Sequence, residues 1–324
     1  MTETPGWSAP DAQPPPEQAA PRTSAPVVTT PAPEAETRVL PLRPLTVGEV
    51  LDGSVDVLRT HAKIVFTASV AVAVVTQLVV LAFTLPFVDD LNVLGSLDPD
   101  TVTPDQYLQQ LTNGYFAVFG GSLAGQFAKV LGLTVMSGFM SVIVGRSVLG
   151  QSITPREVWA EFRPRLGAVL GVSALFTLMV GAGLFLCFLP GVALWVMFAL
   201  AVPALALERC GAGRSLSRSM ELLKHNGWPR VLGVLALSYV VSLILENVIT
   251  VPFAAVGLLD SFLRGGPELL TATTLVASAV GGVIAVAVTT PFHAGVTAIL
   301  YVDRRMRGEG LDIDLRRAAG HAPG

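Results

Sequence analysis

The sequence predicts an all-α integral membrane protein: a six-helix bundle with short inner-face amphipathic helices and a disordered N-terminal tail. Three observations support this fold class. Only 14% of the 324 residues are charged, whereas soluble domains carry about 25%, so the charges are too few to cover a water-exposed surface. Six long apolar stretches each reach the roughly 20 residues that a helix needs to cross a hydrocarbon core. Lys and Arg gather between alternate stretches, as the positive-inside rule requires.

The first 40 residues form the predicted disordered, Pro-rich tail. Eleven of the 23 prolines lie within residues 1–44, and the segment opens MTETPGWSAP, without the basic start and apolar core of a signal peptide. So few large apolar side chains cannot offset the entropy of ordering the chain. A Pro-rich ligand for a partner domain is the alternative, but Pro14-Pro15-Pro16 is short for one. The folded membrane domain is expected at 41–317, followed by a flexible end at 318–324.

Each apolar stretch is expected to be a helix, because backbone exposed to lipid must satisfy its own hydrogen bonds. The last stretch would reach about 51 Å, so it has to tilt, protrude or bend, with Pro291 as the bend point. Thr289 or Thr290 could bond the carbonyl that this proline frees. His293 is expected to be neutral and hydrogen-bonded to a neighbouring helix. The six spans are predicted at about 64–88, 116–145, 166–188, 189–207, 231–256 and 269–302.

The distribution of charge orients the spans. With both termini on the inner side, the inner segments hold 19 of the 21 Lys and Arg. The first outer loop, DDLNVLGSLDPDTVTPDQYLQQ, holds five Asp and no base. This asymmetry predicts a multi-pass protein of the plasma membrane with cytoplasmic N- and C-termini, surrounded by the lipid bilayer.

Three inner segments begin like short amphipathic helices. Thr46 precedes Glu49 by the spacing of a capping box. Thr154 precedes Glu157 by the same spacing, with Pro155 at the first helical position. The third segment is expected to begin at Ser215. Each segment turns basic before it enters a span, so it should lie in the membrane interface. Together they suggest three units, each an interfacial helix followed by a two-span hairpin.

Lys129 and Glu246 interrupt two of the apolar stretches. A charge at mid-membrane costs about 2.5–3.5 kcal/mol on insertion scales and usually faces a partner or a cavity. By helical rise they lie about 20 Å and about 15 Å from the outer ends of their spans, so we predict an intramembrane polar pair, with Asn247 nearby. The pair either fixes helix packing or serves as a polar gate or proton site. Alternatively, Lys129 marks the outer edge of the second span.

A densely charged stretch, YVDRRMRGEGLDIDL, follows the last span at residues 301–315. Arg304, Arg305 and Arg307 are expected just inside the membrane, where each contributes about 1 kcal/mol when close to anionic lipid headgroups. The acids among them argue against a purely basic patch, so pairing with the other inner segments is expected as well. Specific phosphate or headgroup binding stays the alternative.

Three segments resemble one bacterial family over about residues 42–316. PLTVGEVLDGSVDVLRTH, PALALERCGAGRSLSRSMELL and LYVDRRMRGEGLDIDL look like the multi-span membrane domain sometimes attached to a glycerophosphodiester phosphodiesterase. That enzyme is a barrel of about 250 residues with a His-Arg-Gly start and a Glu-x-Asp metal pair. The chain has no His-Arg-Gly, so the resemblance implies a stand-alone membrane domain without that activity. The residues that fall at the family's spacing are Arg218-Ser219, Trp228, Asp303, Arg305, Arg307, Glu309-Gly310 and Asp312.

No catalytic constellation stands out in the sequence. It has no G-x-S-x-G, H-E-x-x-H or Walker A motif, no metal-ligand spacing and no pattern for nucleic-acid binding, so no enzyme activity, cofactor, metal or nucleic acid is expected. The leading hypothesis is a non-enzymatic scaffold or lipid-contacting partner. The alternative is a small transporter or lipid-handling protein with a polar site near Lys129 and Glu246, and a membrane-embedded enzyme is the third. A water-filled cavity reaching mid-membrane would favour transport, and a solid bundle would favour the scaffold.

Overall fold

The computed structural model describes six stretches of the chain. By its contacts the chain divides into residues 1–36 and 37–324, and only the second unit holds described residues. No strand occurs among these residues, so the predicted all-α class is confirmed. The predicted N-terminal tail and the predicted flexible end lie outside them. The described residues are 44–95, 103–148, 153–186, 188–224, 227–264 and 271–309.

Helices make up nearly all of the described chain. In order they are α1 (Val47–Thr60), α2 (Ala62–Thr84), η1 (Leu85–Phe87), α3 (Val88–Gly95), α4 (Pro104–Val148), α5 (Pro155–Phe162), η2 (Arg163–Arg165), α6 (Leu166–Leu186), α7 (Phe188–Phe198), α8 (Ala201–Glu208), α9 (Ala212–Leu223), α10 (Trp228–Arg264) and α11 (Ala272–Glu309). Six segments are long and apolar enough to cross a membrane, as predicted.

The second and fourth spans differ most from the sequence prediction, and α10 and α11 end eight and seven residues beyond the predicted 256 and 302. α4 begins at Pro104 rather than at 116, and its 45 residues reach about 68 Å, which is longer than a bilayer core. The fourth crossing is divided between α7 and α8. Pro203 lies in the first turn of α8 and has no N–H to donate to the carbonyl of Ala199, so the helical ladder is interrupted there.

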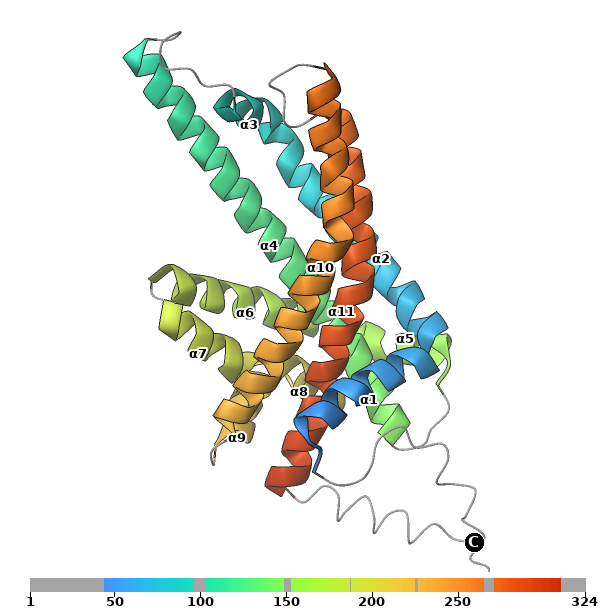
Figure 1. Ribbon diagram of the computed structural model, residues 1–324. Helices are drawn as coiled ribbons and strands as arrows, with labels where there is room; N and C mark the ends of the chain where they lie inside the picture. The colour runs from blue at the N-terminus through green and yellow to red at the C-terminus, as the bar shows by residue number, and fades with distance from the viewer. Residues whose placement is uncertain are drawn as a thin grey trace, which may run out of the picture. The chain divides into compact units, whose positions relative to one another are not determined.

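α11 is the central helix of the bundle. α10 packs along it, and α1, α2 and α4 also lie against it (Figure 1). The α6–α7 hairpin packs on α4, α8 and α9 instead, and in the view of Figure 1 it runs across the direction of α10 and α11. α1 packs more on α11 than on α2, which follows it directly. α1 therefore does not form a self-contained unit with the hairpin that follows it.

Arginines from five segments meet at one end of the bundle, which we call the Arg-rich face. Four of them pair with carboxylates, and Arg304 donates to a backbone carbonyl. α1, α5 and α9 lie at this end, where interfacial helices belong. The arginines that define this face are Arg146, Arg165, Arg218, Arg230 and Arg304.

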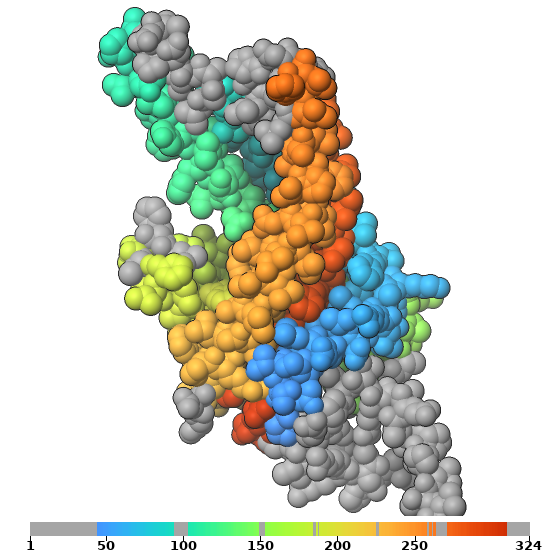
Figure 2. All heavy atoms as spheres, in the orientation of Figure 1, coloured from blue at the N-terminus to red at the C-terminus, as the bar shows by residue number. Residues whose placement is uncertain are grey.

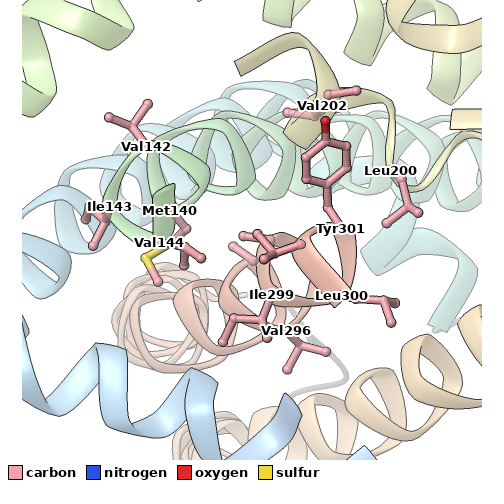
Figure 3. Close-up of a cluster of buried hydrophobic side chains, with 14 of the residues drawn as sticks. Met140, Val142, Ile143, Val144, Leu200, Val202, Val296, Ile299, Leu300 and Tyr301 are labelled. Carbon is pink, nitrogen blue, oxygen red and sulfur yellow. The ribbon is translucent and has the colours of Figure 1, made fainter. Parts of the chain in front are cut away.

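The buried core lies next to the Arg-rich face. Figure 3 shows side chains of α4, such as Met140, together with those of α11, such as Ile299. Met140, Ile143 and Ile299 are fully buried. Farther from this face, large apolar side chains are exposed; Phe116 and Phe262, for example, are 71% and 83% exposed. An apolar surface this extensive marks contact with lipid rather than water.

Local sequence signals fix the starts of two amphipathic helices. At α1 the predicted capping box is present: the Glu49 N–H donates to Thr46 Oγ1 at 3.3 Å, and the Thr46 N–H donates to Glu49 Oε2 at 2.7 Å. At α5, Thr154 accepts from the N–H of Glu157, and Pro155 takes the first helical position. Both starts are confirmed because their signals act within four residues of chain.

The predicted start of the third amphipathic helix is wrong. α9 begins at Ala212, after Gly211, and no side chain caps it. Ser215 is fully buried, and its hydroxyl donates to the Ala212 carbonyl at 2.7 Å. A serine that bonds the preceding turn from inside a helix looks in the sequence like a capping serine.

A serine on α2 compensates for the proline inside α11. Pro291 has no N–H, so the Ala287 carbonyl four residues earlier loses its helical partner. Ser69 donates its hydroxyl to that carbonyl at 2.6 Å. The predicted role of Thr289 or Thr290 is therefore wrong, and the Thr289 hydroxyl bonds the preceding turn of α11 instead. The bond ties α2 to α11 at the point where α11 lacks one of its own.

We predict that Ser69→Ala lowers the free energy of unfolding by about 1–3 kcal/mol, because it leaves the Ala287 carbonyl unpaired between helices. Thermal unfolding of the detergent-solubilised protein measures the change. Thr67→Ala is the matched control, since Thr67 is exposed and donates to the Lys63 carbonyl of its own helix. Equal melting temperatures for the two variants would contradict the compensating role of Ser69.

Candidate functional site: a cavity between the spans

A large cavity opens between α4 and the α6–α7 hairpin. The two segments approach closely at Gly138, where an added Cβ would lie 2.7 Å from the ring of Phe162 and 3.6 Å from Val169. Beyond this contact α4 and α6 diverge. The space between them measures about 1060 Å³, and residues of α2, α7, α10 and α11 also line it. Figure 2 shows the molecule hollowed between α4 and the hairpin. We call this space the V-shaped cavity.

Aromatic and aliphatic side chains line the V-shaped cavity. Phe127 of α4 and Phe176 of α6 lie on its two diverging walls. Trp195 of α7 and Tyr239 of α10 meet edge to face, with ring centroids 6.3 Å apart. None of the described residues that line the cavity carries a formal charge. Such a lining favours an apolar ligand held by few polar groups.

Polar atoms gather at the end of the cavity nearest the Arg-rich face. His293 of α11 lines this end, and its Nδ1 lies 2.9 Å from the hydroxyl of Ser238 on α10, which is the predicted bond to a neighbouring helix. Thr297, one turn further on, donates to the His293 carbonyl at 2.8 Å. Ser137 of α4 also lines this end, and its buried hydroxyl has no hydrogen-bond partner within the described part of the chain. Buried polar atoms are normally paired, so Ser137 is available to a ligand.

Lys129 and Glu246 lie beside the V-shaped cavity. Lys129 Nζ of α4 is 2.5 Å from Glu246 Oε1 of α10, and these two helices otherwise scarcely touch. The side chains remain 41% and 29% exposed, so the pair is not sealed in the core. Asn247, expected nearby, donates instead to a carbonyl of its own helix. Ala128 and Val130, on either side of Lys129, line the cavity, so the ion pair braces α4 against α10 at the cavity's edge.

Asp303 of α11 is a fully buried carboxylate that anchors the start of α1. It accepts from the backbone N–H of Leu45 at 2.8 Å, and Arg230 and Arg307 donate to the same carboxylate at 3.2 Å and 3.0 Å. Both arginines also donate to the Leu45 carbonyl, at 2.5 Å and 2.6 Å. Charge-assisted bonds of this kind are about twice as strong as neutral ones. Both polar groups of the Leu45 backbone are thus held by α10 and α11.

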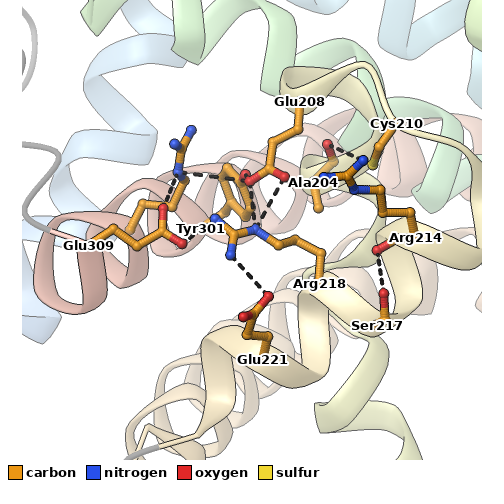
Figure 4. Close-up of polar contacts among 10 residues, drawn as sticks. Ala204, Glu208, Cys210, Arg214, Ser217, Arg218, Glu221, Tyr301 and Glu309 are labelled. Atoms are coloured by element: carbon orange, nitrogen blue, oxygen red, sulfur yellow. Dashed lines mark hydrogen bonds and ion pairs between the residues drawn. The ribbon is translucent and has the colours of Figure 1, made fainter.

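A second carboxylate, Glu208 at the end of α8, joins α9 to α11 (Figure 4). Arg218 donates to its two oxygens at 2.9 Å and 3.1 Å, and the Tyr301 hydroxyl donates to Oε1 at 2.5 Å. Arg218 also bonds Glu309, which Arg305 bonds at 3.0 Å. Burial alone would lower the pKa of Arg218, but hydrogen bonds and charge from Glu208 and Glu309 raise it above its ordinary value. The guanidinium therefore stays charged and links three helices.

The three arginines expected to contact headgroups all have partners inside the protein. Arg304 is buried and donates through Nε and Nη2 to the Leu222 carbonyl near the end of α9, at 3.1 Å and 2.8 Å. Arg305 and Arg307 pair with carboxylates of α11 itself. The charge density of this stretch thus serves internal contacts, in line with the expected pairing, and lipid contact by these three residues stays a prediction.

Sequence reasoning missed Glu161 and Glu208 as members of this network. Glu161 accepts from Arg146 at 3.2 Å and from Arg209 at 3.1 Å, much as Asp303 and Glu208 do for other arginines. The sequence signal for these carboxylates is their position. Each lies near the end of an apolar span and among arginines, where a carboxylate needs a cationic partner. The V-shaped cavity leaves no such signal in the sequence. Among the described residues, no group of three metal-ligating side chains occurs.

These features define a class: a polytopic α-helical membrane protein with a cavity between its spans and a buried ionic network at one face. Residues 102–304 match the family described as "Domain of unknown function (DUF7847)", and the chain belongs to this family. It is similar to a "UPF0259 membrane protein" of Serratia proteamaculans (strain 568), with 24% identity over 189 residues that cover 56% of this chain and 75% of the relative. No solved structure matches the chain. Neither comparison indicates an enzyme family.

We predict that Lys129→Met and Glu246→Leu each destabilise the protein and that the double variant recovers most of the loss. Each single change leaves a charge without its partner in apolar surroundings, and removing both charges avoids that cost. Melting temperatures of the four proteins in one detergent complete a double-mutant cycle. We expect a coupling of at least about 1 kcal/mol. Strictly additive losses would show that the contact contributes nothing.

Asp303→Asn should loosen α1 from the Arg-rich face, because Arg230 and Arg307 lose the buried carboxylate that they share. Limited trypsin digestion reports this, and we expect cleavage after Arg59 to become several-fold faster. Asp56→Asn is the control, since Asp56 lies on the exposed side of α1 and pairs with no described residue. If both variants are digested at the wild-type rate, the carboxylate does not anchor the helix.

Proposed function

We propose that this protein binds an uncharged, long-chain amphiphile in the V-shaped cavity and handles lipid within the bilayer. The cavity is the observation that supports the proposal. It measures about 1060 Å³, lies among the candidate spans and has no formally charged residue in its described lining. Small-molecule sites usually measure about 300–1,000 Å³, so the space suits a ligand with a long chain. A solid bundle would have favoured a pure scaffold.

The chemistry of the lining supports a neutral ligand rather than a charged one. A charge moved into apolar surroundings without a partner is strongly disfavoured, and the lining offers no counter-charge. A hydroxyl or ester can instead bond Ser137, whose hydroxyl is unpaired within the described chain. Phe83 and Phe119 lie toward the opposite end of the cavity and suit a hydrocarbon chain. The proposed ligand class is therefore a diacylglycerol-like lipid or a long-chain alcohol.

In this proposal the ligand enters sideways from the bilayer. The hollow between α4 and the hairpin opens among exposed apolar side chains such as Phe119 and Leu178, which are 53% and 66% exposed. The Lys129–Glu246 ion pair joins α4 to α10 beside the cavity. We propose that it acts as a brace that holds the helices apart, rather than as a proton site.

We further propose that the protein is not an enzyme and that it lies in the plasma membrane with cytoplasmic termini, so that the Arg-rich face is cytoplasmic. The resemblance to the membrane domain of glycerophosphodiester phosphodiesterases would then be a distant kinship of the membrane part alone.

A scaffold for protein partners is the second candidate. The network around Asp303 and Glu208 favours the scaffold function, because these ion pairs make the Arg-rich face rigid.

Gly181→Trp tests the lipid-handling proposal. Gly181 lines the V-shaped cavity, and an added Cβ there meets nothing within 4 Å. Purified full-length protein would be irradiated with a photoreactive diacylglycerol, and the labelled peptides would be mapped by mass spectrometry. We expect labelled peptides from α4 and α6. In the variant the amount of label should fall at least fivefold, because the indole fills the cavity.

Gly171→Trp is the matched control for this experiment. Gly171 lies on the same helix, its Cβ would also meet nothing within 4 Å, and it does not line the V-shaped cavity. A photoreactive phosphatidic acid with the same chains supplies the charged comparison and should label the cavity far less. Equal losses in the two variants, or equal labelling by the two lipids on α7 and α10, which line only the V-shaped cavity, would contradict the proposal and leave the scaffold as the better account.

A further inference from the structure

A second groove runs along the other side of α4. It measures about 710 Å³, with α2 and α5–α6 as its walls and α4 as its floor, and we call it the α2–α5 groove. From Lys63 to Val79 it follows α2 for about 24 Å. One leaflet contributes about half of a hydrocarbon core of about 30 Å. The groove is therefore long enough to hold an acyl chain of one leaflet along its whole length.

The mouth of the α2–α5 groove carries cations that have no carboxylate partner. Lys63 lines the groove and forms no ion pair with any described residue. Arg156 and Arg163 are likewise unpaired within the described chain, and they flank Trp159, which lines the groove and is 51% exposed. Residues three and four apart share a helix face, so Trp159 and the two arginines form one stripe. The cations that do pair at the Arg-rich face include Arg146, Arg165, Arg209, Arg218, Arg230, Arg305 and Arg307.

The acids of α5 do not neutralise these cations, because other arginines already hold them. Glu157 lies 2.8 Å from Arg146. Glu161 lies 3.2 Å from Arg146 and 3.1 Å from Arg209. The positive charge at the mouth of the groove is therefore uncompensated within the described chain, directly beside an apolar channel.

We infer that the α2–α5 groove binds an anionic phospholipid. One acyl chain lies between α2 and α6, and the phosphate is held by Lys63, Arg156 and Arg163. Trp159 suits this place because tryptophan is enriched at the headgroup level of membranes. Cationic side chains near that level favour anionic lipid. The polar residues of this site are not those of the V-shaped cavity, so the inference does not rest on the proposed function.

Native mass spectrometry of the full chain tests the inference, with phosphatidylglycerol and phosphatidylcholine of identical acyl chains as the probes. We expect wild-type protein to bind phosphatidylglycerol at least tenfold more tightly. Lys63→Gln and Arg163→Gln should each weaken that binding about fivefold and leave phosphatidylcholine unchanged. Arg214→Gln is the matched control, because Arg214 is an exposed cation of α9 whose guanidinium forms no ion pair with any described residue, and it does not line the groove.

Leu170→Trp tests the acyl chain separately, since Leu170 lines the groove on α6. It should weaken phosphatidylglycerol binding while every cation stays in place. Equal binding of the two lipids, a loss in Arg214→Gln as large as in Lys63→Gln, or displacement by millimolar inorganic phosphate would overturn the inference. So would a lipid-free dimer that Leu170→Trp disrupts, which would assign the groove to a second copy of the chain. Gly181→Trp should retain phosphatidylglycerol, so failure here and failure of the proposed function are distinguishable.

Discussion

Hydrocarbon offers no hydrogen-bond partner, so each polar group between the spans has to be satisfied within the protein. The structure meets this constraint with bonds between elements far apart in sequence. Ser69 bonds the carbonyl that Pro291 leaves free, and Asp303 holds the backbone of Leu45. Each bond satisfies a polar group and also fixes two helices against each other. Within the described chain, the buried hydroxyls of Ser137 and Ser242 are the side-chain exceptions, and Ser137 lines the V-shaped cavity.

The sequence predicts those parts of the fold that depend on short stretches of chain. Six spans follow from hydropathy, and the starts of α1 and α5 follow from capping signals that act over four residues. The start of α9 is missed because Ser215 satisfies its hydroxyl inside the helix. The partner of the Ala287 carbonyl is missed because it comes from another helix, 218 residues away. Local signals cannot specify a bond that exists only after the helices have packed.

The same distinction applies to the candidate site. The agreement in depth that suggested Lys129 and Glu246 as partners is a property of single helices, and the structure places their charged atoms 2.5 Å apart. The V-shaped cavity instead depends on where α4 and α6 diverge, which Gly138 and Phe162 determine by their contact. Whether an arginine of the Arg-rich face is paired depends in turn on which helix end brings a carboxylate to it. Counting basic residues predicts an orientation for the spans, but it does not separate structural cations from those available to a ligand.

α4 separates a cavity whose described lining carries no charge from a groove with a lysine at its mouth, and the depths of their polar residues agree with this difference. Lys63 begins the α2–α5 groove in the first turn of α2, beside the Arg-rich face, where an anionic headgroup keeps contact with water. Ser137 lies about 14 Å along α4 from Arg146, close to the middle of a core of about 30 Å. At that depth a charged group is disfavoured by several kcal/mol, whereas a hydroxyl needs only one hydrogen-bond partner. In the two proposals, the polar end of each lipid therefore lies at the level of the membrane where polar or charged side chains of the protein can bond it.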